Sequence, residues 1–338
     1  VTPDRPILID RFLKHALECE ADAISDGTHA YVPAVMEHIE LAGIHSGDSA
    51  CIIPSRHISD EHLQTIKEYT RRIAEEMHVV GLMNMQYAIE NDTVYVLEAN
   101  PRASRTVPLV SKVCGIAMVP IATDIITSGI TGRPSPVGDL KERVIPYYGV
   151  KEAVFPFNMF QEVDPLLGPE MRSTGETLGL ADTTGEAFCK AEEAASASLP
   201  ADGTVLISLN DRDKPEAAAL SAAFHKAGFR ILATGRTYNL IRESGIPAEK
   251  VKKLYEGRPN ILDLITNGKI DRIINSPSEK VSYQDDSYLR KNAIRAHIPY
   301  MTTVAAAHAA AEGIVQMQKE GTGGIRSLQE WHAKIHTC

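Results

Sequence analysis

The spacing of apolar residues predicts short strands over the first hundred residues. Apolar and polar positions alternate there, and strands are expected over residues 6–12, 18–25, 30–40, 81–89 and 94–99. Asp26-Gly27 and the four residues 90–93 lie between neighbouring strands and predict two hairpin turns. The pattern therefore favours an antiparallel sheet.

A helical spacing interrupts these strands and returns further along the chain. Four apolar residues recur at helical intervals after Ser59, whose hydroxyl favours an N-cap. They are Leu63, Ile66, Ile73 and Met77. A second helical stretch, 107–128, is broken around Gly115, and a third is expected over 184–198. Between them, residues 129–180 are rich in Gly and Pro with little periodicity, so we expect ordered loop there.

From residue 203 onward, strands alternate with helices. Strands are expected over 204–209, 229–233, 272–275 and 299–301, and helices over 214–227, 237–244, 261–266, 287–296 and 304–319. This alternation is typical of a parallel sheet with helices on both faces, whose ligands bind at the carboxyl ends of the strands. The loops at those ends are 210–214, 234–237, 275–277 and 302–303. The predicted fold class is mixed α/β: an antiparallel sheet, a helical and loop segment, then a Rossmann-like parallel domain.

Composition narrows the class of protein. The 338 residues are 43% hydrophobic and 23% charged, which is ordinary globular composition and excludes a disordered chain. The 35 basic and 44 acidic residues give a net charge of −9, which disfavours non-specific nucleic-acid binding. No run of about 18 apolar residues predicts a membrane-spanning helix. The five cysteines contain no CxxC pair, which favours reduced thiols and a cytoplasmic location.

The densest group of polar residues lies between positions 86 and 105. Glu98 and Asn100 are two residues apart at the end of a strand, so their side chains point to one face, and Gln86 on the paired strand reaches the same face. Oxygen ligands on one face suit Mg²⁺ or Mn²⁺, which share such sites with nucleotide phosphates. Arg102 and Arg105 follow, and guanidinium groups bind phosphate oxygens and neutralise a phosphoryl group in transfer. The alternative is that Glu98 forms a surface ion pair with one of these arginines.

Several segments together resemble one enzyme family. They are LMNMQ (82–86), EANPR (98–102), RTVP (105–108), MEHIELAGIHSGDSA (36–50), DPLLGPEMRSTG (164–175) and YEGRP (255–259). The first three resemble the metal-binding strands of ATP-grasp ligases. All six together resemble the large subunit of carbamoyl phosphate synthetase, over nearly the whole chain. The resemblance implies the C-terminal portion of an ATP-grasp fold over 1–130, a connecting segment over 131–202 and a methylglyoxal-synthase-like allosteric domain over 203–338.

The resemblance implies an ATP-dependent ligase reaction. In that family the second synthetase half phosphorylates carbamate with ATP, as part of making carbamoyl phosphate from bicarbonate, glutamine-derived ammonia and ATP for pyrimidine and arginine biosynthesis. Gln86, Glu98 and Asn100 would hold the divalent ions, and Arg102 and Arg105 would face the phosphates or the carbamate. The residues expected at the nucleotide are Arg11, Leu13, Glu18, Gly43, Ile44, His45 and Ser46, together with Gln86 and Glu98. For His45, a solvated loop position is the alternative.

The resemblance also implies three further binding sites. A potassium site would use His38, Glu40, Ile44 and Ser49, unless His38 and Glu40 simply share one strand face. An ornithine site would use Glu40, Asp48, Glu152 and Thr302. A UMP- or IMP-like effector would be bound by Lys214, Thr234, Thr237, Lys253 and Asn275, unless the two lysines are solvated surface residues. Arg236 and Pro277 depart from the family pattern in this pocket, which leaves the effector open.

The resemblance implies partners and leaves other functions open. The partners would be the small glutaminase subunit, the upstream remainder of the large subunit and a second copy of the regulatory domain. One alternative is an effector-binding module with vestigial catalytic residues. A methylglyoxal synthase is disfavoured, because Asn275-Ser276-Pro277 stands where that enzyme has Gly-Gly-Asp. The chain begins at Val1, and no glycine-rich phosphate-covering loop precedes residue 7, so we expect a piece of a longer chain that does not turn over by itself.

Overall fold

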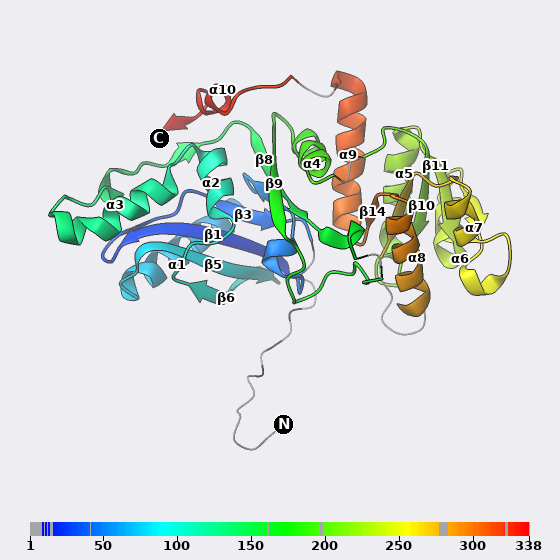
Figure 1. Ribbon diagram of the computed structural model, residues 1–338, viewed down its shortest axis with the longest axis horizontal. Coiled ribbons are helices and arrows are strands. Elements are labelled where there is room, and N and C mark those ends of the chain that lie inside the picture. The colour runs from blue at the N-terminus through cyan, green and yellow to red at the C-terminus, as the bar shows by residue number, and fades with distance from the viewer. Residues whose placement is uncertain are drawn as a thin grey trace, which may run out of the picture.

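Two sheets, one antiparallel and one parallel, organise the chain (Figure 1). The computed structural model describes residues 9, 11, 13, 16–40, 42–160, 162–196, 199–276, 283–321 and 324–337. The mixed α/β class expected from the sequence is confirmed. The strand expected over 6–12 lies largely outside the described residues.

The antiparallel sheet occupies the left part of Figure 1. Its strand order is β6-β5-β1-β3-β4-β8-β9, and the short β2 pairs with β1. The strands are β1 (Leu17–Asp26), β2 (Ala30–Tyr31), β3 (Val35–His38), β4 (Cys51–Ile53), β5 (Val80–Glu90), β6 (Thr93–Asn100), β8 (Tyr148–Val154) and β9 (Gly175–Ala181). Helix α1 (Asp60–Glu76) packs on one face, while α2 (Val107–Cys114) and α3 (Met118–Thr131) cover part of the other. As predicted, the Ser59 hydroxyl caps α1 by accepting the His62 N–H.

The two faces of β1 carry different residues. The odd positions, such as Cys19 and Ala21, join a buried cluster with Ile66 of α1. The even positions change along the strand: Ile24 reaches the core formed with α2, whereas Glu20 and Asp22 are polar although they are 2% and 1% exposed. Because side chains alternate along a strand, this arrangement leaves a buried polar patch on one face of the sheet.

The parallel sheet forms the right part of Figure 1 and has the order β12-β11-β10-β13-β14. Its strands are β10 (Thr204–Ser208), β11 (Arg230–Thr234), β12 (Glu249–Val251), β13 (Arg272–Asn275) and β14 (Tyr300–Met301). Its helices are α5 (Ala217–Lys226), α6 (Gly235–Glu243), α7 (Ile261–Thr266), α8 (Tyr283–Arg295) and α9 (Val304–Glu320). All neighbouring strands run parallel, and apolar residues are buried on both faces of the sheet. The alternation of strands and helices after residue 203 therefore predicted the right architecture.

Helices α4 (Thr184–Ala194) and α9 lie side by side between the two sheets (Figure 1). They cross at Gly185 and Gly313, where an added Cβ on Gly313 would lie 2.4 Å from the Gly185 carbonyl oxygen. A side chain larger than hydrogen does not fit such a crossing. Since α4 also packs on β8 and β9 and α9 packs on α5, the helix pair joins the sheets.

Three sequence predictions differ from the structure. The single strand expected over 30–40 is divided into β2 and β3, and Pro33 lies between them without an N–H to donate. The loop expected over 129–180 contains β8 and β9, which extend the antiparallel sheet. Strand β8 is buried on both faces, so its apolar residues do not alternate with polar ones. The helix expected over 184–198 ends at Ala194.

The C-terminal segment returns to the antiparallel sheet. Helix α10 (Leu328–His332) lies near α2, and β15 (His336–Thr337) pairs with β7 (Arg143–Val144). Cys19, Cys51, Cys114 and Cys189 are buried and free, while Cys338 lies outside the described residues. Among the described residues, no single helix is long and apolar enough to cross a bilayer; α2 and α3 together meet the length and composition test but are bent by 110°.

Candidate functional site

The residues predicted to bind a metal ion share one face of two paired strands. Gln86 of β5 lies directly opposite Glu98 of β6, and Asn84 lies opposite Asn100. Residues opposite each other in an antiparallel pair project to the same side, so Gln86, Glu98 and Asn100 are brought together as expected. The register places Glu20 of β1 opposite Gln86 on the far side of β5, which extends the same polar face.

The atoms of this set fit a divalent cation. The Gln86 amide nitrogen donates to Ser46 Oγ at 3.1 Å, which leaves the amide oxygen to face a cation. Asn100 Nδ2 is buried without a hydrogen-bond partner among the described residues, and rotation of this amide would put its oxygen there instead. Glu98 is exposed and forms no ion pair with either arginine in the described part of the chain, so the alternative of a surface ion pair is not what the structure forms. Two amide oxygens and one carboxylate are hard oxygen ligands of the kind Mg²⁺ and Mn²⁺ take.

Arg102 and Arg105 lie in the loop between β6 and α2, directly after these ligands. Arg102 Nη1 donates to the Ala103 carbonyl oxygen at 3.2 Å, and Arg105 Nη1 donates to Ser173 Oγ at 3.2 Å. Both side chains are exposed, so each guanidinium keeps further N–H donors for an anion. The loop therefore presents two positive charges beside the candidate metal ligands.

Part of the expected nucleotide contacts gather over the same face. The Gly43 N–H donates to Glu18 Oε1 at 3.0 Å, and the His45 N–H donates to the Gly168 carbonyl at 2.8 Å. His45 Nδ1 accepts the Gly47 N–H at 3.0 Å, so this ring closes its own turn rather than lying free in solvent. Glu18, Gly43, His45 and Ser46 are thus brought together.

The other expected nucleotide residues are less closely gathered. Leu13 is buried against Ala16 and Ala88, and Ile44 is half-buried in the loop that holds His45. Arg11 is exposed, and its nearest acidic partner is Glu90 at 4.0 Å.

His38 lies between two carboxylates at the base of the polar face. Its Nδ1 is 3.6 Å from Glu18 Oε2 and its Nε2 is 3.4 Å from Glu20 Oε1. Burial opposes charge on His38, but the neighbouring Cys51, Glu18 and Glu20 raise the pKa of His38 well above its usual value. Burial likewise opposes charge on Glu20, but His38 lowers the pKa of Glu20 to about 2. Each shift favours the charged form of its group.

The expected potassium ligands are not joined by direct contacts. Glu40 Oε2 accepts the Ala50 N–H at 2.6 Å, and Ser49 Oγ donates to the His45 carbonyl oxygen at 3.4 Å. Among the described residues, no hydrogen bond or ion pair links either of them to His38. Ile44 contributes a half-buried position in the same loop.

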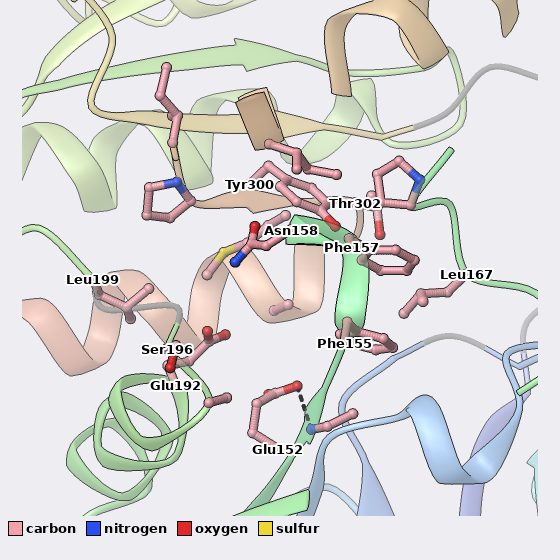
Figure 2. Close-up of a pocket in the computed structure, with 18 of the residues that line it drawn as sticks. Glu152, Phe155, Phe157, Asn158, Leu167, Glu192, Ser196, Leu199, Tyr300 and Thr302 are labelled. Atoms are coloured by element: carbon pink, nitrogen blue, oxygen red, sulfur yellow. Dashed lines mark hydrogen bonds between the residues drawn. The ribbon is translucent and has the colours of Figure 1, made fainter. Parts of the chain in front are cut away.

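A cavity of about 330 Å³ lies between the two sheets (Figure 2). Glu40, Glu152 and Thr302, three of the four residues expected to bind ornithine, line it. Asp48 does not, because its carboxylate accepts the N–H groups of Arg172 and Ser173 at 2.8 and 2.9 Å.

The sequence reasoning missed Glu192, which α4 adds to the cavity wall (Figure 2). Burial raises the pKa of Glu40 to about 7 and that of Glu192 to about 8, and burial with Glu192 nearby raises the pKa of Glu152. Several carboxylates enclosed in this way suit a cationic ligand. Glu192 lies in the helix that the sequence predicts over 184–198. Nothing in the sequence indicated that this helix packs beside β8.

The expected effector residues lie mostly at the carboxyl end of the parallel sheet. Thr234 ends β11 and Asn275 ends β13, and Thr234 Oγ1 is 2.8 Å from Ser208 Oγ at the end of β10 between them. The Thr237 hydroxyl accepts the Leu209 N–H at 3.2 Å. These side chains converge as expected for a parallel sheet.

The two lysines of this set are placed differently. Lys214 is paired with Asp211 and its side chain is 16% exposed, so it is not a freely solvated lysine. Lys253 follows β12 at the sheet edge and is half-buried. Arg236 Nη1 lies 3.5 Å from Asp211, in the same loop region, while Pro277 falls outside the described residues.

Comparison with known proteins gives matches along the chain. Residues 2–131 match the family model described as carbamoyl-phosphate synthase L chain, ATP binding domain, and residues 216–302 match the MGS-like domain. The carbamoyl phosphate synthase large chain of Gemmatimonas aurantiaca is 49% identical over 332 residues, which cover 98% of this chain and 30% of that protein.

Shorter relatives match as well. The proteins named carbamoyl phosphate synthase large chain, C-terminal section, of Aquifex aeolicus and Methanopyrus kandleri are 44% and 46% identical over 98% of this chain. The chain spans 65% and 62% of their lengths. Among solved structures, the biotin carboxylase subunit of a pyruvate carboxylase matches 53% of this chain and 44% of that one, with 15% identity and a TM-score of 0.40.

Proposed function

Since this chain belongs to the family of carbamoyl phosphate synthase large chains, we propose that it carries the site at which ATP phosphorylates carbamate. The chain spans about a third of the full-length large chains that it matches, so the activity is that of a larger assembly. We propose three parts: 1–130 for the ATP-grasp portion, 131–202 for the connecting segment and 203–338 for the allosteric domain.

One observation carries this proposal. Gln86 faces Glu98 across the β5–β6 pair, with Asn100 two residues further along and the arginine-bearing loop directly after it. These three side chains would hold a Mg²⁺ or Mn²⁺ ion, which when bound offsets the negative charge of the ATP phosphates. Arg102 and Arg105 would bind the phosphate or carbamate oxygens. Because carbamate is already an anionic nucleophile, the chain has to position and neutralise charge rather than remove a proton.

Effector binding forms a second part of the proposal. The cavity lined by Glu40, Glu152 and Thr302 would take ornithine, whose two ammonium groups match the carboxylates. Thr234, Thr237 and Asn275, with the two lysines, would bind a nucleoside monophosphate at the sheet end. A potassium ion near Glu40 and Ser49, a small glutaminase subunit and the rest of the large chain complete the proposed assembly.

The test changes one metal ligand and one matched residue. The synthetase is assembled with this chain as the C-terminal part of its large chain, and ATP formation from ADP and carbamoyl phosphate is measured. Glu98→Gln removes the only carboxylate of the metal set and is expected to lower kcat by about 100-fold or more. Glu76→Gln makes the same change in charge at an exposed position of α1 and is expected to leave kcat within about twofold.

The same variants distinguish the competing function. If Glu98→Gln keeps the rate of the unchanged enzyme, the metal assignment is wrong. If the assembly forms no ATP and the chain still binds ornithine or UMP by calorimetry, the chain is an effector-binding module with vestigial catalytic residues.

A further inference from the structure

Asp22 is the centre of a buried hydrogen-bond network beneath residues 101–106, the segment that we call the arginine loop. The Asp22 side chain is 1% exposed, and no part of the proposed catalytic set includes it. Its Oδ1 accepts hydrogen bonds from Asn84 Nδ2 at 3.0 Å and from Ser104 Oγ at 2.8 Å. Its Oδ2 accepts one from Thr106 Oγ1 at 2.7 Å. Two of these three donors belong to the arginine loop.

Thr106 joins Asp22 to the residue at which α2 begins. Thr106 occupies the N-cap position of α2, where a threonine hydroxyl ordinarily accepts a backbone N–H of the first turn. Here the side chain makes no capping hydrogen bond, and its hydroxyl donates to Asp22. The start of α2 is therefore fixed to β1 rather than capped by its own residue.

The arginine loop begins after β6, and Asp22 binds the β5 residue that pairs with the end of that strand. Asn84 of β5 lies opposite Asn100, the last residue of β6, and its amide nitrogen donates to both Asp22 and Glu20, at 3.0 and 3.1 Å. Arg102 and Arg105 lie between Asn100 and Thr106. Asp22 thus holds the arginine loop directly at Ser104 and Thr106, and it also binds Asn84, the residue paired with the end of the strand that precedes the loop.

We propose that Asp22 is a positioning residue that fixes the arginine loop, so that Arg102 and Arg105 are held beside the metal ligands for phosphoryl transfer. The role of Asp22 in phosphoryl transfer rests on the proposed function. Its role in holding the arginine loop in place does not. A carboxylate has lone pairs for all three donors at once, and a charged acceptor makes shorter and stronger hydrogen bonds than a neutral one. An asparagine keeps one acceptor oxygen, and an alanine keeps none.

The experiment compares variants of Asp22 with a buried residue of helix α1, which packs on the other face of the same sheet. Thr70 of α1 is fully buried, and its hydroxyl lies 2.6 Å from the Tyr87 hydroxyl on the opposite face of the sheet. Thr70→Val removes a buried hydrogen bond there without touching the loop. Asp22→Asn, Asp22→Ala and Thr70→Val are made in the assembled synthetase, and both hydrogen exchange of the amides 102–106 and the kinetics of ATP formation are measured.

The expected result separates positioning from stability. Asp22→Ala should speed exchange of the loop amides by at least about tenfold and lower kcat by at least about tenfold, with KM for ADP changed less than about threefold. Asp22→Asn should change the exchange of the loop amides and kcat less than Asp22→Ala does. Thr70→Val should lower the melting temperature while leaving loop exchange and kcat unchanged.

Two results would overturn the inference. One is loop exchange in Asp22→Ala that matches the unchanged chain. The other is a loss of kcat in Thr70→Val as large as that in Asp22→Ala, because the effect would then be one of stability alone. A synthetase that forms no ATP with any variant contradicts the proposed function instead, and the exchange measurement still decides whether Asp22 holds the loop.

Discussion

The ion pair between Asp164 and Arg290 offers a quantitative test of how the connecting segment is held against the parallel sheet. Arg290 of α8 has a side chain that is 0% exposed, and Asp164 has one that is 17% exposed. The guanidinium donates from Nε to Oδ1 and from Nη2 to Oδ2, each at 2.8 Å. This two-point geometry inside the protein is the strongest arrangement that an arginine and a carboxylate form.

Asp164→Asn removes the charge and one acceptor while keeping the size of the side chain. Arg290 would then stay buried without its carboxylate partner, and in the described part of the chain it would keep the hydrogen bond from its Nη1 to Asn275 Oδ1 at 3.3 Å. Removing one partner of a buried pair costs about 3–5 kcal/mol of unfolding free energy. The matched control is Glu249→Gln, which breaks the pair between Arg230 and Glu249, where both side chains are 57% exposed, and should cost less than about 1 kcal/mol.

Urea unfolding measures this difference. Circular dichroism follows both sheets, and the fluorescence of Trp331, the single tryptophan, follows the antiparallel sheet on which the C-terminal segment packs. We expect the free energy of unfolding of Asp164→Asn to be at least about 2 kcal/mol lower than that of Glu249→Gln. Equal losses in the two variants would refute the reasoning, because burial would then not have strengthened the pair.

The dependence of stability on pH tests the same ion pair independently. Partial burial raises the pKa of Asp164, but the hydrogen bond with Arg290 and its charge lower the pKa below the ordinary value of 3.8. A carboxyl group with a lowered pKa in the folded state contributes stability that is present above the unfolded pKa and is lost as the pH falls through the folded one. The difference between the unchanged chain and Asp164→Asn should therefore shrink below about pH 4.

Two further predictions concern the helix crossing and the cavity. Gly313→Ala places a Cβ 2.3 Å from Cys189 Sγ, so we expect a loss of about 1–3 kcal/mol or more in thermal unfolding, while Gly324→Ala, which meets nothing within 4 Å, should be neutral. Ornithine should bind the cavity more tightly as the pH rises from about 6 to 8, because burial raises the pKa of Glu40 to about 7 and that of Glu192 to about 8, and both become charged over this range. Calorimetry in two buffers of different ionisation enthalpy would detect the released protons, and an affinity independent of pH would contradict the assignment.

The candidate metal set was predictable because it depends on a short-range rule. Glu98 and Asn100 share a face through the two-residue period of a strand, and the hairpin brings Gln86 opposite Glu98. The same rule held an unused signal: Glu18, Glu20 and Asp22 alternate with Cys19 and Ala21 along β1. A run of acids at every second position of an otherwise apolar strand indicates a buried polar face.

The cavity was not predictable in the same way. Glu40 lies more than a hundred residues before Glu152 and Glu192 in the chain. The three meet because β3, which Glu40 follows, pairs with β4, β4 pairs with β8, and α4 packs on β8. Strand β8 is buried on both faces, which removes the alternation that would mark it as a strand. Without β8 the sequence could not indicate that α4 adds a carboxylate beside Glu152.

The segment that looked like loop, residues 164–173, turns out to touch both halves of the molecule. Asp48 accepts the N–H groups of Arg172 and Ser173, and Arg172 Nη1 donates to the Asp164 carbonyl oxygen at 2.6 Å. Ser173 in turn accepts from Arg105 at 3.2 Å. At its other end the same segment binds Arg290 through Asp164.

These contacts form one continuous series of hydrogen bonds. In order, its members are Arg105, Ser173, Asp48, Arg172, Asp164, Arg290 and Asn275. A continuous series does not by itself couple its ends, since coupling requires that its members have two arrangements with different energies. Asp164→Asn weakens the series at the link between Asp164 and Arg290 while leaving the contacts of Arg105 in place. If the segment is rigid, exchange of the amides in the arginine loop will not change in that variant, whereas a change would mean that the placement of Arg105 depends on a carboxylate held by the parallel domain.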